Sequence, residues 1–210
     1  MLSLAVGAGA YGAGLAALDA LGYPAELLTP DPNSVAGQPA YVGLFSTLGV
    51  MLWGAASAVC FLAAAAVRRA GRGTRVDFLV ATGALCLVAG VDDAALFHEI
   101  VAPRLGVPQA VVLAVYAAAG AGWLLYFRGV LRASGPVLPA VFMGCFAVMV
   151  VVDQLELSRL VEDYFKLVGM AALLTFVASE ALTSLGGLAG PSDRVGTSPP
   201  GNGPGGAAGR

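Results

Sequence analysis

The stretch YVGLFSTLGVMLWGAASAVCFLAAAAV, residues 41–67, contains no charged side chain. A helix rises about 1.5 Å per residue, so roughly 20 consecutive apolar residues are enough to cross the hydrocarbon core of a bilayer. The stretch also lacks the alternation of polar and apolar positions that is typical of strands in a membrane barrel. It therefore predicts a transmembrane helix.

Five more stretches of this kind occur along the chain. The six predicted spans cover residues 3–22, 41–67, 76–100, 110–128, 136–153 and 163–185. Of the 210 residues, 58% are hydrophobic and 11% are charged, and this charged share is less than half of the roughly one quarter found in soluble domains. The sequence thus predicts an all-α, polytopic membrane bundle of about six helices.

The predicted domain organisation is simple. Residues 1–185 form the membrane domain, and its first span lacks the basic segment that opens a signal peptide, so we expect it to be retained as a helix. Residues 186–210 are rich in Gly and Pro and cannot bury enough apolar surface to order themselves. We expect them to form a disordered cytoplasmic tail.

Basic residues concentrate on one side of the predicted bundle. The loops after the second and fourth spans contain Arg68, Arg69, Arg72, Arg75, Arg128 and Arg132. The opposite side holds only Arg104, Arg159 and Lys166. Because short cytoplasmic loops collect Lys and Arg, the pattern predicts a plasma-membrane protein with both termini in the cytoplasm.

The third predicted span ends in VAGVDDAALFHEIVAP, residues 88–103, which includes the only histidine of the chain. Asp92 and Asp93 would lie about one helical turn beneath the outer membrane boundary. Charged groups inside the hydrocarbon core are unfavourable and usually find partners there. In a continuous helix, Asp92 and Glu99 would share one face, and no carboxylate stands three or four residues from His98. Partners must therefore come from other helices.

The best partners lie in LSRLVEDYFKLVG, residues 157–169, where the last span begins. Glu162 and Asp163 precede Lys166 by four and three residues, which favours local pairing on a helix. Lys166 lies about one turn inside the span, so we expect a carboxylate from Asp92 or Asp93 to approach it. The two segments together predict one polar cluster near the outer leaflet.

Three interpretations of this cluster stay open. In the first, the charges form a ring at the membrane interface with no further role, which is a favourable position for them. In the second, carboxylates and one imidazole converge on a divalent metal cation, whose bound water would serve hydrolysis of a lipid-like substrate. In the third, the acids and Lys166 form a proton or cation relay, continued inward by Glu180 with Asp77.

The motif DDAALFHE at residues 92–99, with EDYFK at 162–166 and the loop APRLGVP at 102–108, resembles a pattern in uncharacterised bacterial multi-pass membrane proteins of similar length. The resemblance covers roughly residues 76–185 and implies no activity. It implies that one unit is formed by Asp92, Asp93, His98, Glu99, Glu162, Asp163 and Lys166. Membrane hydrolases related to alkaline ceramidases hold zinc with three histidines, so a chain with one histidine departs from them.

These observations predict an integral membrane protein with a metal- or cation-binding site near the outer leaflet. The predicted metal ligands are Asp92, His98, Glu99, Glu162 and Asp163. Asp93 and Lys166 are the predicted orienting or proton-handling groups of a catalytic site. Predicted partners are the lipid bilayer and a cation or a lipid-like small molecule, not nucleic acid. The alternatives are an ion-coupled transporter and a structural subunit, either as a homo-oligomer or within an envelope complex.

Overall fold

The computed structural model describes residues 2–20, 22, 30, 32–69, 73–155 and 157–186. All regular elements in this part of the chain are helical, which confirms the all-α prediction. Two parts of the chain named in the sequence analysis lie outside the described residues: Arg72 and the tail from residue 187.

The chain divides into two compact units, Met1–Leu44 and Phe45–Arg210. The first unit contains helix α1 (Leu2–Ala20), which coincides with the first predicted span, and the short helix α3 (Pro32–Val35). The side-chain amide of Asn33 donates to the carbonyl of Val42 at 2.7 Å and closes the loop after α3.

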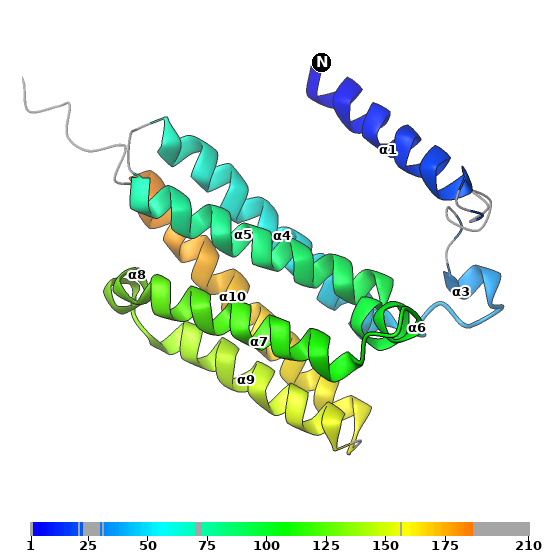
Figure 1. Ribbon diagram of the computed structural model, residues 1–210. Coiled ribbons are helices and arrows are strands. Elements are labelled where there is room, and N and C mark those ends of the chain that lie inside the picture. Colours follow the sequence, from blue (N-terminus) through cyan, green and yellow to red (C-terminus); the bar gives the residue numbers. More distant parts are fainter. Residues whose placement is uncertain are drawn as a thin grey trace, which may run out of the picture. The chain divides into compact units, whose positions relative to one another are not determined.

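The second unit is a bundle of five long helices (Figure 1). These are α4 (Leu44–Arg68), α5 (Gly73–Ala95), α7 (Gln109–Tyr126), α9 (Val137–Gln154) and α10 (Arg159–Gly186). Each contains a segment long and apolar enough to cross a membrane. Predicted spans two, four, five and six agree with them to within four residues at each end.

Short helices complete the second unit. A π-helical turn, η1 (Phe97–Val101), and α6 (Ala102–Arg104) follow α5. Helix α8 (Arg128–Ser134) follows α7 after Phe127, where the sequence predicted a loop. The chain then turns at Gly135, whose φ of 93° suits glycine, and Pro136 precedes α9.

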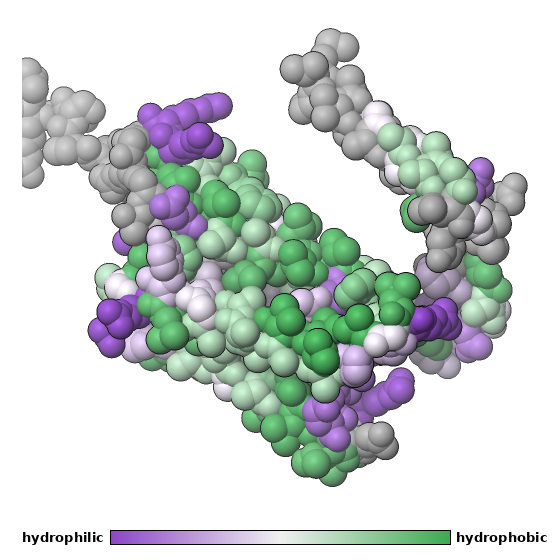
Figure 2. Space-filling model, viewed as in Figure 1, coloured by the Kyte–Doolittle hydropathy of each residue, from purple (hydrophilic) through white to green (hydrophobic). Residues whose placement is uncertain are grey.

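The five long helices define two ends of the bundle (Figure 1). We name the end where α5 and α9 finish and α7 and α10 begin the acidic end, because Asp92, Glu99 and Glu162 lie there. The opposite, basic end carries Arg68, Arg75, Arg128 and Arg132. Figure 2 shows hydrophobic surface over the middle of these helices and hydrophilic residues gathered towards the ends. This distribution suits a lipid bilayer around the middle of the bundle.

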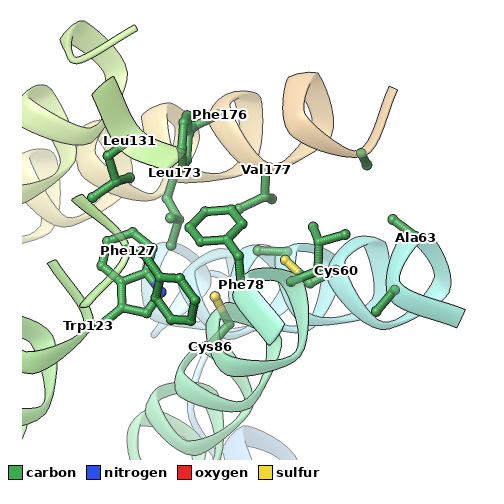
Figure 3. Packing of buried hydrophobic residues seen from close by; sticks show 14 of the residues in the cluster. Cys60, Ala63, Phe78, Cys86, Trp123, Phe127, Leu131, Leu173, Phe176 and Val177 are labelled. Atoms are coloured by element: carbon green, nitrogen blue, oxygen red, sulfur yellow. The ribbon is translucent and has the colours of Figure 1, made fainter. Parts of the chain in front are cut away.

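The core of the bundle is aromatic and aliphatic. Phe78 on α5 is fully buried and contacts the rings of Trp123, Phe127 and Phe176, with ring centroids 5.6, 5.3 and 6.1 Å away (Figure 3). The indole of Trp123 donates to Thr82 at 2.9 Å, so the one polar edge of this cluster is satisfied.

Two glycines set how closely the helices approach. A Cβ at Gly90 on α5 would stand 2.9 Å from the Cβ of Trp53 on α4, and one at Gly169 on α10 would stand 3.0 Å from the Cβ of Cys145 on α9. Small residues at such points allow membrane helices to pack closely. Helices α4 and α5, and helices α9 and α10, are therefore in close contact at these glycines.

Candidate functional site

Helix α5 ends earlier than the sequence predicted. Leu96 takes the left-handed conformation, with φ 49° and ψ 42°, and η1 begins at the next residue. The expected continuous helix over residues 76–100 is therefore wrong at its outer end. This backbone conformation is uncommon for a branched residue, and π turns inside helices often accompany functional sites.

The interruption turns His98 back onto Asp92. The backbone N–H of His98 donates to Asp92 Oδ1 at 3.0 Å, and ring atom Nδ1 lies 2.5 Å from Oδ2. The side chain of Asp92 is 7% exposed. Both carboxylate oxygens of Asp92 are thus committed to holding the turn.

The second nitrogen of the imidazole is directed towards Glu99. Atom Nε2 of His98 lies 3.6 Å from Glu99 Oε1, which is too far for a hydrogen bond. The His98 side chain is 19% exposed, and that of Glu99 is 49% exposed. In a helix that continued through Leu96, these contacts with Asp92 would not form.

Asp93 forms a separate ion pair with Lys166. Lys166 Nζ on α10 donates to Asp93 Oδ1 at 2.5 Å, and each side chain is 14% exposed. The predicted approach of a span-three carboxylate to Lys166 is therefore confirmed for Asp93. The second oxygen, Oδ2, is buried and has no hydrogen-bond partner within the described residues.

Gly49 on α4 closes this ion pair from a third helix. A Cβ at this position would stand 3.2 Å from Lys166 Cε and 3.4 Å from Asp93 Oδ2. The absence of a side chain at Gly49 lets α4 approach the pair closely and leaves it mostly buried. Sequence reasoning missed Gly49, because one glycine within a helix does not reveal what it faces.

A second ion pair joins the same two helices at the basic end. Arg75 Nη1 on α5 lies 2.5 Å from Glu180 Oε2 on α10, and the Glu180 side chain is 5% exposed. By sequence alone, Arg75 is a topology signal, and Glu180 is expected to act with Asp77. The structure instead pairs Glu180 with Arg75 and leaves Asp77 exposed.

Glu162 lines a polar cleft of about 680 Å³ at the acidic end. The cleft lies between the start of α7, the end of α9 and the start of α10. Its lining residues are Gln109, Val152, Asp153, Gln154, Leu157, Ser158, Arg159 and Glu162. The amides of Gln109 and Gln154 donate to Asp153 Oδ2 at 3.3 and 3.1 Å.

The electrostatic surroundings of Glu162 are mostly acidic. Among the described residues, Asp153, Asp163 and Glu99 are near enough to act on its carboxylate, as is the cation Lys166, and Arg159 lines the same cleft. Lys166 is already paired with Asp93. No ion pair of Glu162 or Asp163 is formed within the part of the chain that the structure describes.

The structure thus divides the predicted cluster into three neighbouring groups. One is the turn of Asp92, His98 and Glu99, the second is the Asp93–Lys166 pair, and the third is the cleft with Glu162. In the described ranges, no three His, Cys, Asp or Glu side chains are placed so that they could hold one metal ion. The groups stay separate because Asp92 contacts His98, whereas Asp93 contacts Lys166.

Residues 3–179 match the model of a protein family described as a domain of unknown function (DUF8692). The chain belongs to this family. The DUF8692 match includes α1, the whole acidic end and its cleft, and it ends one residue before Glu180. This agrees with the resemblance to a family without a described activity. No curated protein and no solved structure matches the chain.

Proposed function

We propose that this protein is a plasma-membrane protein that binds a cationic group in the cleft at its acidic end. One observation carries the proposal: Glu162 is a half-buried carboxylate in a polar cleft, with acidic neighbours and with its nearest lysine committed to another acid. Partly buried charges are unfavourable without a partner, and like charges nearby add to this cost.

Lys166 is the natural alternative partner of Glu162. The two residues are four apart on α10 in the order that favours pairing. The Asp93 carboxylate holds the ammonium at 2.5 Å, and α4 covers it at Gly49. Among the described residues Glu162 also forms no ion pair with Arg159, which lines the same cleft. Its carboxylate is therefore open to a ligand, and Asp153 supplies a second carboxylate in the cleft.

The orientation proposed for the protein places the cleft outside. Most of the described arginines near helix ends, Arg68, Arg75, Arg128 and Arg132, lie at the basic end, and cytoplasmic loops collect such residues. With six spans, both termini are then cytoplasmic. About 27 Å of α5 separates Arg75 from Asp93 at about 1.5 Å per residue, close to the hydrocarbon thickness of about 30 Å. The cleft then lies at the level of the outer headgroups.

A divalent metal at the turn is a second candidate, supported by a different observation. Two ligands of a tetrahedral zinc ion, each at about 2.0–2.2 Å, stand about 3.3–3.6 Å apart, and the His98 Nε2 to Glu99 Oε1 distance is 3.6 Å. Asp92 would then be the carboxylate that orients the histidine ligand rather than a ligand itself. Loss of stoichiometric Zn²⁺ in His98→Ala, with retention in Glu162→Gln, is the expected result; metal-free wild-type protein after Zn²⁺ supplementation would exclude this site.

The contacts of the described residues do not favour a relay through the bundle. Glu180 is paired with Arg75, and Asp77 lies exposed rather than beside it. The core between the two ion pairs consists of buried apolar side chains such as Phe78, Leu79 and Val177. A charge crossing this core would have to leave its partners for an apolar environment.

Calorimetric titration of the purified protein in maltoside micelles tests the cationic site. Ethanolamine is the probe, and ethylene glycol is its uncharged counterpart of the same size. Wild-type protein should bind ethanolamine, and Glu162→Gln should weaken binding at least about tenfold, because a charge-assisted hydrogen bond is lost. Asp77→Asn removes an exposed acid at the other end and should leave binding unchanged. Equal binding of the two probes, or an unchanged affinity in Glu162→Gln, would overturn the proposal.

A further inference from the structure

The cleft also contains a positively charged side chain, which would not bind a cation. Arg159 is exposed, lines the same cleft as Glu162 and stands three residues before it on α10. Among the described residues it forms no ion pair, either with Glu162 or with Asp153. The described lining residues thus present two carboxylates and one guanidinium that do not form ion pairs with one another.

The surroundings of Arg159 suit an anion. It is the first residue of α10, where backbone N–H groups lack partners within the helix and the helix dipole favours negative charge. Ser158, with a hydroxyl donor, lines the cleft next to it. Arginine is well matched to phosphate because its planar guanidinium can donate two parallel hydrogen bonds.

Three exposed leucines, which we call the leucine rim, lie in or next to the chain segment that lines the cleft. Leu155, Leu157 and Leu160 are 61%, 66% and 74% exposed, and Leu157 itself lines the cleft. Exposed leucines beside a polar cleft at the end of membrane-spanning helices suit the boundary between lipid headgroups and acyl chains. A free polar solute would not use these side chains, whereas a phospholipid would.

Resting on the proposed function, we infer that the ligand of the cleft is a zwitterion that carries an ammonium and a phosphate, as in an ethanolamine phosphate headgroup. The ammonium is bound by Glu162 with Asp153, and the phosphate is bound by Arg159 with Ser158. The acyl chains of a phospholipid would lie along the leucine rim. The same headgroup chemistry also occurs in free phosphoethanolamine.

Titration with ethanolamine and with phosphoethanolamine in maltoside micelles tests this inference. Wild-type protein should bind phosphoethanolamine at least about tenfold more tightly than ethanolamine, because the phosphate gains charge-assisted hydrogen bonds. Arg159→Gln should abolish this difference between the two probes. Arg128→Gln, an exposed arginine at the basic end, should retain it.

The outcomes separate the two proposals. If ethanolamine binds but phosphoethanolamine binds no more tightly, or if Arg159→Gln has no effect, the zwitterion is excluded while the cationic site stands. If ethanolamine does not bind, the proposed function itself fails.

Nanodiscs distinguish the two sources of the headgroup. A lipid in the cleft predicts that soluble phosphoethanolamine binds at least about tenfold more weakly in nanodiscs of phosphatidylethanolamine than in nanodiscs of phosphatidylglycerol, because the headgroup competes with it. Equal affinity in the two nanodiscs would assign the cleft to a free zwitterion instead.

Discussion

Asp93 near the end of α5 and Lys166 near the start of α10 are 73 residues apart in the chain, and Lys166 Nζ lies 2.5 Å from Asp93 Oδ1. The Arg75–Glu180 pair joins the same helices at their other ends with the charges exchanged. Helix α5 thus contributes an acid at one end and a base at the other. The antiparallel helix α10 contributes the oppositely charged partner at each end, Lys166 and Glu180. A shift of α10 along α5 would break both pairs, so together they fix the register of the two helices.

Separating the partners of the Asp93–Lys166 pair should destabilise the bundle. Lys166→Met leaves a largely buried carboxylate without its cation, and we expect a loss of about 3 kcal/mol in the free energy of unfolding. The double variant Asp93→Asn/Lys166→Met should recover most of this loss, because neither charge then remains. Reversible unfolding in mixed micelles measures both values, and purely additive effects would contradict a direct pair.

Substitutions of the two partners in the Arg75–Glu180 pair should lower the free energy of unfolding by different amounts. Arg75→Gln leaves Glu180, which is 5% exposed, without its partner, whereas Glu180→Gln leaves Arg75, which is 32% exposed and can reach water. We expect the arginine variant to lower the free energy of unfolding more than the glutamate variant. Unfolding curves for the two variants test this order, and the reverse order would show that Glu180 is not held as described.

Gly49 should tolerate little added volume. Gly49→Ala places a Cβ 3.2 Å from Lys166 Cε, so we expect a destabilisation of about 1–3 kcal/mol from overpacking. Gly54 is the matched control on the same helix, because a Cβ there meets nothing within 4 Å. Gly54→Ala should be neutral or stabilising by up to about 1 kcal/mol through helix propensity. Similar effects at the two glycines would argue against a covered ion pair.

His98 should be protonated on Nδ1 in its neutral form. This nitrogen faces Asp92 Oδ2 at 2.5 Å, so its proton is held by the carboxylate while Nε2 stays free towards Glu99. The chain has one histidine, so the nitrogen NMR signals of the imidazole report on this site alone. Asp92→Asn should move the tautomer population towards protonation of Nε2. A dominant Nε2–H form in the wild type would show that the turn at Leu96 is not formed.

The membrane-spanning helices could be predicted because they depend on local composition. Apolar blocks gave the positions of α4, α7, α9 and α10 closely, and the distribution of arginine indicated the basic end. Lys166 could be expected to find a carboxylate because an isolated charge inside an apolar helix is unfavourable. These inferences use only the chemistry of one segment at a time.

The remaining features depend on contacts between segments distant in sequence. Leu96 carries no signal for a left-handed residue, since glycine or asparagine would be typical there. Gly49 matters only because α4 meets α5 and α10 at that level, and Arg75 reads as a topology residue until α10 brings Glu180 beside it. The cleft likewise arises where Gln109, Asp153 and Glu162 meet from three helices.

In the proposed site, Asp93 holds Lys166 and thereby leaves Glu162 open to a ligand. Ethanolamine affinity in Asp93→Asn tests it most directly, because the released Lys166 can turn to Glu162 four residues earlier. We predict that Asp93→Asn weakens ethanolamine binding at least about tenfold and that Asp93→Asn/Lys166→Met restores it. Unchanged affinity in Asp93→Asn, with the protein folded, would contradict the claim.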